Sequence, residues 1–228
     1  MDRKTSVRGT IYNFIVGEVK GMKKDYCHIG IVLDSSGSMD LIKNDIIGTF
    51  REFIKKQKEL PGECTFSLYS FNHDVSKLVD FEDLKKSEKD FMADYLPSGC
   101  TALYDGIGTA VSEIGTKLHL LDESNRPDKV LIAIITDGQE NASKEYDHKR
   151  VTDMIKEQKE KYNWEFLFLA ANQDAMSVGS TFGFSKNQCM TFSADSSGVK
   201  DFTRSIGAYT TMYRSNVDMK GVDLSSLK

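Results

Sequence analysis

Uninterrupted apolar runs constrain the fold of this chain more than any other feature. They cover residues 27–34 and 130–135, and a further strand is expected at 164–170. Runs of this length are typical of strands that are buried on both faces of a sheet. Strands that alternate with amphipathic helices predict an α/β fold, a doubly wound sheet with helices on both faces. Apolar residues recur at helical spacing in the segments where we expect the main helices, residues 41–59, 102–118, 147–162 and 196–213.

One pair of expected strands breaks this alternation. Residues 64–71 and 75–81 are separated only by the turn sequence Asn72-His73-Asp74. Because so tight a turn requires antiparallel strands, the central sheet should be mostly parallel with one antiparallel edge strand. We expect the tip of this hairpin to lie away from the carboxyl ends of the parallel strands and to be structural. The smaller expected features are helices at 84–95 and 174–182, a strand at 189–192, a loop at 126–128 and an N-cap at Asp40.

The length of 228 residues suits one large domain with a well-buried core. We expect an N-terminal extension at 1–25, the folded domain at 26–214 and a C-terminal tail without a strong pattern at 215–228. Residues 10–19 predict a strand or hairpin arm within the extension. The sequence leaves open whether the extension packs on the sheet, exchanges between subunits or stays unstructured. It also leaves the oligomeric state open.

The composition argues against several classes of function. A net charge of −4 and a pI of about 5.6 argue against the broad basic face of a nucleic-acid-binding protein. Neither a secretory signal pattern nor an apolar stretch approaching the ~20 residues of a membrane span is present. The cysteines lie far apart, without a CxxC pair, at Cys27, Cys64, Cys100 and Cys189. We therefore expect reduced thiols, no zinc site and a cytoplasmic protein.

Oxygen-bearing side chains lie in three expected loops along the chain, two of which follow a strand. Asp34, Ser36 and Ser38 come directly after the first apolar run, Thr101 begins an expected helix, and Asp137 follows the run at 130–135. In doubly wound sheets, ligands bind outside the carboxyl ends of the strands, where the strand order reverses. Carboxylate and hydroxyl oxygens suit Mg²⁺, Mn²⁺ or Ca²⁺. With few direct carboxylates, such a site would still attract an anionic oxygen from another molecule.

These segments together resemble the von Willebrand factor A (vWA) family. Residues 34–38 match its DxSxS signature, residues 99–103 resemble its threonine loop, and residues 136–138 resemble its TDG loop. The resemblance covers residues 26–213 approximately and implies a metal-ion-dependent adhesion site (MIDAS). It points to the intracellular type found in bacteria and their phages.

The resemblance also implies a role for each site residue. Ser36 and Ser38 would bind the ion through their hydroxyls, and Thr101 would do so directly or through water. Asp34 and Asp137 would act through water and by orienting the serines. The usual ion is Mg²⁺, with Mn²⁺ or Ca²⁺ as possible substitutes, and the open position would accept a Glu or Asp of a protein partner.

Three functions remain open at this point. The first is a metal-dependent protein-interaction module without catalysis, with neither a membrane nor a nucleic acid as partner. The second is a Mg²⁺-dependent phosphohydrolase in which Asp34 is the nucleophile, although Ser36 replaces the second aspartate that this chemistry needs. The third is a structural subunit whose site does not bind metal.

Several polar residues near the site also have simpler interpretations. Asp105 lies one helical turn beyond Thr101; it either supports the metal loop or, as the favoured interpretation, belongs to a solvated helix face. Cys100, next to a predicted ligand, is interpreted as a small packing residue in preference to a reactive thiol. Residues 139–141 either border the site or form an ordinary polar loop.

Overall fold

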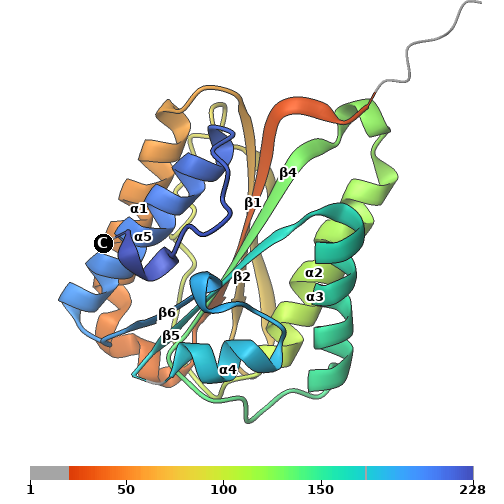
Figure 1. Ribbon diagram of the computed structural model, residues 1–228. Helices are drawn as coiled ribbons and strands as arrows, with labels where there is room; N and C mark the ends of the chain where they lie inside the picture. The colour runs from red at the N-terminus through yellow and green to blue at the C-terminus, as the bar shows by residue number, and fades with distance from the viewer. Residues whose placement is uncertain (1–20, 173, 228) are drawn as a thin grey trace, which may run out of the picture.

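The computed structural model describes residues 21–172 and 174–227, so the expected strand at 10–19 lies outside the described residues. The described chain forms a three-layer α/β fold with a central six-stranded sheet in the order β3-β2-β1-β4-β5-β6 (Figure 1). Every neighbouring pair is parallel except β2 and β3, so the predicted antiparallel edge strand is confirmed. The strands are β1 (Lys23–Asp34), β2 (Glu63–Phe71), β3 (Val75–Asp83), β4 (Pro127–Thr136), β5 (Glu165–Ala171) and β6 (Cys189–Phe192).

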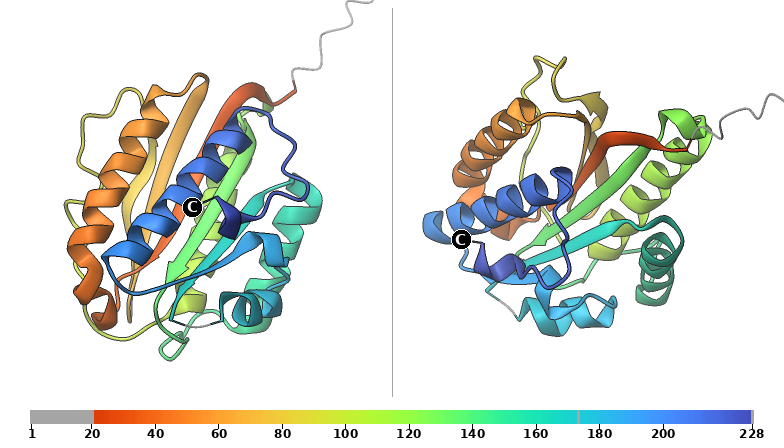
Figure 2. Two further views of the ribbon diagram at one scale, coloured as in Figure 1. Left: turned by 60° about the vertical axis from the view of Figure 1, so that its left-hand side comes forward. Right: turned by 45° about the horizontal axis from the view of Figure 1, so that its top comes forward.

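Helices cover both faces of the sheet, as predicted. Helices α1 (Lys43–Glu59) and α5 (Ser196–Arg214) lie side by side on one face, and α2 (Leu103–Leu120) and α3 (His148–Tyr162) cover the other (Figures 1 and 2). The short helix α4 (Ala175–Thr181) follows β5. Short 3₁₀ helices complete the elements at η1 (Gly37–Ile42), η2 (Glu123–Asn125), η3 (Lys186–Gln188) and η4 (Leu224–Ser226).

The alternation of side chains along β1 explains the two cores. Ile29 and Ile31 face the α1 and α5 layer, whereas Val32 faces the α2 and α3 layer, and all three are fully buried. Because both faces of the strand are covered, its sequence is a continuous apolar run. The chain passes from β1 to β2 on one side and returns to β4 on the other. The strand order therefore reverses between β1 and β4, and their carboxyl ends form the expected binding edge.

The predicted helix at residues 84–95 is wrong. This segment consists of turns in which side-chain oxygens accept hydrogen bonds from the backbone. Asp83 accepts from the Lys85 amide at 3.0 Å, and Asp90 accepts from the Met92 amide at 3.2 Å. Such short-range bonds compete with helical hydrogen bonding. The buried Met92 side chain then anchors the turns in the α1 core.

Element boundaries differ from the predictions at several points. Asp40 lies inside η1 and is not the N-cap of α1, because a 3₁₀ turn precedes that helix. Pro127, expected in a loop, is the first residue of β4, where the missing amide of a proline is tolerated. Strand β1 begins at Lys23, before the expected domain boundary. The tail contributes Leu224, which is fully buried against the core that α1 and α5 cover.

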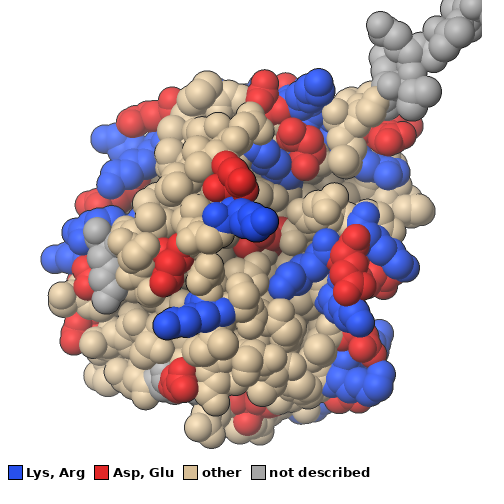
Figure 3. Space-filling view, viewed as in Figure 1, with Lys and Arg blue, Asp and Glu red and all other residues tan. Residues whose placement is uncertain are grey.

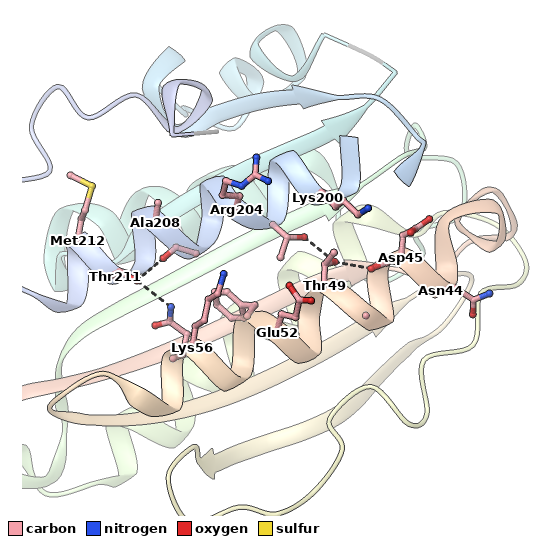
Figure 4. Close-up of a pocket in the computed structure, with 15 residues that line it drawn as sticks. Asn44, Asp45, Thr49, Glu52, Lys56, Lys200, Arg204, Ala208, Thr211 and Met212 are labelled. Atoms are coloured by element: carbon pink, nitrogen blue, oxygen red, sulfur yellow. Dashed lines mark hydrogen bonds between the residues drawn. The ribbon is translucent and has the colours of Figure 1, made fainter. Parts of the chain in front are cut away.

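A groove of about 700 Å³ runs along the seam between α1 and α5 (Figure 4). Its lining combines small residues with long side chains such as Lys56 and Arg204, and hydroxyl groups tie the two helices together across it. The Thr203 hydroxyl is 3.1 Å from the Thr49 hydroxyl, and Gln57 donates to Thr211 at 3.5 Å.

Charged side chains of both signs are interspersed on the face shown in Figure 3. At the lower end of this view, where β1 and β4 end, uncharged residues cover most of the visible surface. In residues 21–172 and 174–227, none of the helices is long and apolar enough to cross a membrane.

Candidate functional site

Asp34, the last residue of β1, organises the loop that follows it. Its side chain is fully buried. One carboxylate oxygen accepts a hydrogen bond from the Ser36 amide at 2.7 Å, and the other accepts from the Thr136 hydroxyl at 2.6 Å. Thr136 is the last residue of β4, so these bonds tie the two strand ends together at the point where the strand order reverses.

Ser36, Ser38 and Asp137 form a cluster of side-chain oxygens at this edge. The Ser38 hydroxyl donates to Asp137 Oδ1 at 2.7 Å, and the two serine hydroxyls are 3.2 Å apart. The Ser36 hydroxyl is 3.5 Å from the same Asp137 oxygen. Ser36 is buried, Asp137 is partly exposed and Ser38 is exposed, so the cluster can be reached from solvent. The structure therefore brings together residues that lie about a hundred positions apart in the sequence.

Thr101 joins this cluster through the loop after β4. A Cβ added to Gly138 would lie 2.8 Å from the Thr101 hydroxyl oxygen, so the glycine permits a close approach of the two loops. The Thr101 amide donates to the Asn141 side chain at 2.9 Å, and the Asn141 amide donates back to the Thr101 carbonyl at 3.0 Å. Asn141, which the sequence left as a bordering or ordinary loop residue, thus positions Thr101.

Asp105 is a second positioning residue, and its interpretation as part of a solvated helix face is wrong. Its side chain is buried and accepts three backbone hydrogen bonds, from the amides of Lys144, Glu145 and Tyr146, at 2.8–3.0 Å. These bonds hold the loop between β4 and α3 against α2. Helical spacing places Asp105 beside Thr101. The sequence does not indicate, however, that its carboxylate accepts hydrogen bonds from three amides of a distant loop.

Glu140 secures the same loop from its other side. Its carboxylate accepts from the Ala142 and Ser143 amides at 2.9 and 2.8 Å, and from the Tyr104 amide in the first turn of α2 at 3.0 Å. A carboxylate at a helix N-terminus is favourable because the first amides have no helical partner. Glu140 is therefore engaged in the support of the loop.

Tyr95 supports the first loop of the site. Its buried hydroxyl donates to the Asp34 carbonyl at 2.7 Å. Next to it, the Ser98 amide donates to the Ser35 carbonyl at 2.7 Å. The segment after β3 thus packs along the DxSxS loop. Sequence reasoning did not find Tyr95, because a lone tyrosine in an expected helix carries no sign of this contact.

The hairpin tip at residues 72–74 lies at the site edge, and the prediction that it lies away from the strand carboxyl ends is wrong. The Ala102 amide donates to the Asn72 carbonyl at 2.6 Å, and a Cβ on Gly99 would overlap the His73 ring. Gly99 also has a φ of +76°, a conformation that favours glycine. Since β2 runs parallel to β1, its carboxyl end must reach the same edge of the sheet.

The electrostatics of the cluster are those of an uncompensated acidic site. Burial raises the pKa of the Asp34 carboxyl, and the neighbouring Asp137 charge raises it further. Burial and the charges of Asp34 and Asp137 likewise raise the pKa of Tyr95. In the described part of the chain, neither aspartate forms an ion pair with a lysine, arginine or histidine. A bound cation would relieve this repulsion.

The donor set fits a hard divalent cation. Adjacent oxygen ligands of an octahedral Mg²⁺ ion lie about 3 Å apart, since each is about 2.1 Å from the ion. The Ser36 and Ser38 hydroxyls are 3.2 Å apart, and Ser38 is 2.7 Å from Asp137. Across residues 21–172 and 174–227, His, Cys, Asp and Glu side chains alone make no group of three that could hold a metal ion. A metal site here would therefore depend on the hydroxyl groups.

Comparisons with known proteins identify a family and a fold. The family model described as von Willebrand factor type A domain matches residues 28–205. Among curated proteins, none matches the sequence.

Several solved structures share the fold. Proximal thread matrix protein 1 from the mussel byssus, with a zinc-occupied MIDAS motif, is similar with a TM-score of 0.57 and 14% identity, covering 82% of this chain and 46% of that one. A von Willebrand factor type A protein from Catenulispora acidiphila has a TM-score of 0.55 and 12% identity, covering 84% and 43%. The pilus adhesin SpaC from Lactobacillus rhamnosus GG has a TM-score of 0.62 and 12% identity, covering 86% and 31%. The chain thus spans less than half the length of each.

Proposed function

Because this chain belongs to the von Willebrand factor type A domain family, we propose that it is a protein-interaction module that depends on a divalent cation. Ser36, Ser38 and Thr101 would bind the cation through their hydroxyls, with Asp34 and Asp137 beside them. We propose Mg²⁺ as the usual ion, with Mn²⁺ or Ca²⁺ as substitutes. The ion would bridge the site to a Glu or Asp side chain of a protein partner.

The hydroxyl cluster carries this proposal. Ser38 is exposed and lies 2.7 Å from Asp137, so ligands for a cation meet at a surface that a partner can reach. Neutral hydroxyls leave much of the ion's charge uncompensated, and an incoming carboxylate would therefore bind favourably. The zinc-occupied MIDAS motif of the mussel byssus protein supports a divalent ion at this position of the fold.

We further propose that the site does not catalyse phosphoryl transfer. A nucleophilic Asp34 would have to reach a phosphorus atom, but the side chain is fully buried and both of its oxygens accept hydrogen bonds. The position two residues later is Ser36, which cannot replace a second carboxylate as acid or base. The arrangement supports a role for Asp34 in shaping the loop.

Metal titration of paired serine variants tests the proposal. Mn²⁺ binding is measured by electron paramagnetic resonance for the natural protein, Ser38→Ala and Ser98→Ala. Ser98 is an exposed serine on the adjacent loop, outside the predicted ligand set. We expect Ser38→Ala to weaken Mn²⁺ binding at least about tenfold, equivalent to ~1.4 kcal/mol, and Ser98→Ala to leave it unchanged.

Capture of partners from the host then tests the interaction itself. The natural protein should retain a partner in Mg²⁺ and release it in EDTA, and Ser38→Ala should not retain it. Binding that is insensitive to EDTA and to Ser38→Ala would contradict the proposal. Absence of Mg²⁺ or Mn²⁺ binding at millimolar concentrations would favour a structural subunit. Phosphatase turnover that disappears in Asp34→Asn would favour the hydrolase.

The cytoplasmic location remains part of the proposal. Cys27 and Cys64 lie opposite each other on β1 and β2 as free buried thiols, which suits a reducing compartment. Fractionation of the host with an antibody against the protein would test this location, and recovery outside the cytoplasm would contradict it.

A further inference from the structure

Two large apolar side chains are exposed on the loops of the proposed metal site. Leu41 is 88% exposed and Leu96 is 66% exposed, and in the described part of the chain no large apolar side chain is more exposed than Leu41. A single apolar side chain in water is common, whereas apolar side chains gathered at one place mark an interaction surface. The question is therefore whether both leucines belong to the surface around the site.

Leu41 shares a face of η1 with Ser38. In a 3₁₀ helix, side chains three positions apart lie one above the other. Met39 and Ile42 are three positions apart, and both are buried in the core. Ser38 and Leu41 are also three positions apart, and both are exposed. The period of η1 thus anchors one face in the core and presents a proposed metal ligand together with the leucine on another.

Leu96 lies on a segment that is bonded to the same loop. Just before it, the Tyr95 hydroxyl donates to the Asp34 carbonyl at 2.7 Å. Just after it, the Gly37 amide donates to the Gly99 carbonyl at 3.0 Å. Because Leu96 lies between these two attachments, its backbone is held along the loop that carries the proposed ligands. Both leucines are positioned before a partner arrives, which lowers the entropy cost of binding.

The charged side chains of the loops around the site are all acidic. Residues 35–42, 94–101 and 136–143 contain neither lysine nor arginine, and their charged residues are Asp40, Asp94, Asp137 and Glu140. A bound cation would attract one carboxylate of a partner. A second carboxylate beside the first would meet acidic or apolar surface, and burial of an unpaired charge is unfavourable.

We propose that the partner presents a single Glu or Asp flanked by large apolar side chains. The carboxylate binds the metal ion, and the apolar side chains pack on Leu41 and Leu96, which removes apolar surface from water. This inference rests on the proposed metal-dependent function and adds the chemical character of the partner segment. It excludes polyacidic segments as the preferred ligand of the site.

The amino edge of the sheet offers a matched comparison. Leu120 is 79% exposed at the end of α2, beside a groove that lies between α2 and α3. It is a leucine of similar exposure at the opposite edge from the proposed ligands. Substitution of Leu120 therefore controls for the loss of an exposed leucine as such.

Selection of short random peptides displayed on phage tests the proposal. The immobilised full chain is exposed to the library in Mg²⁺, and bound phage are released with EDTA, so that only metal-dependent peptides are recovered. We expect these peptides to share one Asp or Glu with Leu, Ile, Phe or Met at neighbouring positions. Selection on the double variant Leu41→Ser with Leu96→Ser should keep the acidic residue and lose the apolar preference. Selection on Leu120→Ser should keep both.

The affinity of one recovered peptide then measures the apolar contact. Fluorescence polarisation compares this peptide with a version in which serines replace the apolar neighbours of the acidic residue. We expect the double variant to bind the recovered peptide about tenfold more weakly than the natural protein, from about threefold for each leucine. The serine version keeps the carboxylate and should bind the natural protein and the double variant equally. Leu120→Ser should bind both peptides as the natural protein does.

The outcomes separate this inference from the proposed function. Recovery of no peptides, or of peptides without Asp or Glu, would contradict both. Recovery of acidic peptides with polar or further acidic neighbours would support the metal-dependent function and overturn this inference. Equal weakening of both peptides in the double variant would show that the leucines act only through the metal site and would also overturn it. A loss of affinity confined to Leu120→Ser would do the same by placing the apolar contact at the amino edge.

Discussion

The two edges of the sheet are built in different ways. At the carboxyl edge, side-chain oxygens and backbone amides hold the loops, as when Asp105 accepts three amides of the loop after β4. At the amino edge, a groove lined by apolar side chains such as Leu118 and Trp164 lies between α2 and α3. The same strands and helices thus present a fixed polar site at one end and an apolar groove at the other.

This difference shows how a site with exposed ligands can be precise. Exposed hydroxyls such as that of Ser38 have little packing to hold them in place. Their position depends on buried carboxylates, Asp34 and Asp105, and on the Tyr95 hydroxyl, which fix the backbone of the loops. The amino edge needs no such network, because contact between apolar surfaces has no fixed direction.

The largest expected effect comes from removal of the acceptor that fixes the loop after β4. Asp105→Ala would leave three amides without their partner, and a hydrogen bond to a charged group contributes about 1.5–3 kcal/mol. We expect the free energy of unfolding, measured by urea denaturation, to fall by about 3 kcal/mol. Mn²⁺ binding should weaken as well.

Two variants serve as controls for Asp105. Asp105→Asn keeps one acceptor oxygen and should lose less stability. Asp153→Ala removes an exposed aspartate that pairs with Lys149 on α3 and should change the unfolding free energy by less than ~0.5 kcal/mol. Equal losses in Asp105→Ala and Asp153→Ala would mean that the loop is not held by this network.

The next largest effect is a loss of stability at low pH, and it arises in the amino half of β1. His28 is fully buried beneath α2, stacked on Phe81, and its Nδ1 lies 2.9 Å from the Thr65 hydroxyl. Burial lowers its pKa from 6.5 to about 3, and the nearby Lys117 charge adds to the shift while Asp80 opposes it.

The unfolded chain therefore binds a proton below pH 6.5 that the folded protein does not take up until about pH 3. Stability is lost as the pH falls through this window, by about 2 kcal/mol between pH 6.5 and pH 5. Urea denaturation at both pH values should show that His28→Gln lacks this loss, whereas His119→Gln, at an exposed histidine, retains it. The same pH dependence in both variants would contradict a buried neutral His28.

The fold and the members of the site could be predicted from the sequence because both depend on local patterns. Continuous apolar runs specify buried parallel strands, and the turn at residues 72–74 specifies the antiparallel one. The site residues follow strands whose ends must meet when the strand order reverses. Asp34, Ser36, Ser38 and Asp137 accordingly lie together in the structure.

The supporting contacts could not be predicted, because they join segments that are distant in the sequence. Nothing near Asp105 indicates that it accepts amides some forty residues later. Tyr95 lies in a segment expected to be helical, and its bond to the Asp34 carbonyl depends on the actual course of the turns. The position of His73 was predictable in principle, since a strand parallel to β1 must end at the same edge.

A smaller effect is expected at the contact between the threonine and TDG loops. Gly138→Ala would place a Cβ 2.8 Å from the Thr101 hydroxyl oxygen and displace it. We expect Mn²⁺ affinity to fall about tenfold, or ~1.4 kcal/mol. Gly37→Ala is the matched control, because its Cβ would lie at an ordinary 3.5 Å from the Gly99 carbonyl. Similar Mn²⁺ affinities of the two variants would show that the Thr101 position does not matter for the metal.

The smallest effect distinguishes the two edges by their exposed leucines. Leu41, in η1 just after the DxSxS loop, is 88% exposed, and Leu120, beside the groove at the other edge, is 79% exposed. Neither Leu41→Ser nor Leu120→Ser should change the unfolding free energy by more than ~0.5 kcal/mol. If the partner covers the carboxyl edge, Leu41→Ser should weaken its binding about threefold, or ~0.6 kcal/mol, through lost apolar contact. Leu120→Ser should not weaken partner binding. Calorimetry with the captured partner would measure the affinity of both variants. A loss of partner binding in Leu120→Ser instead would assign the interaction to the groove, and the comparison of the two edges would be reversed.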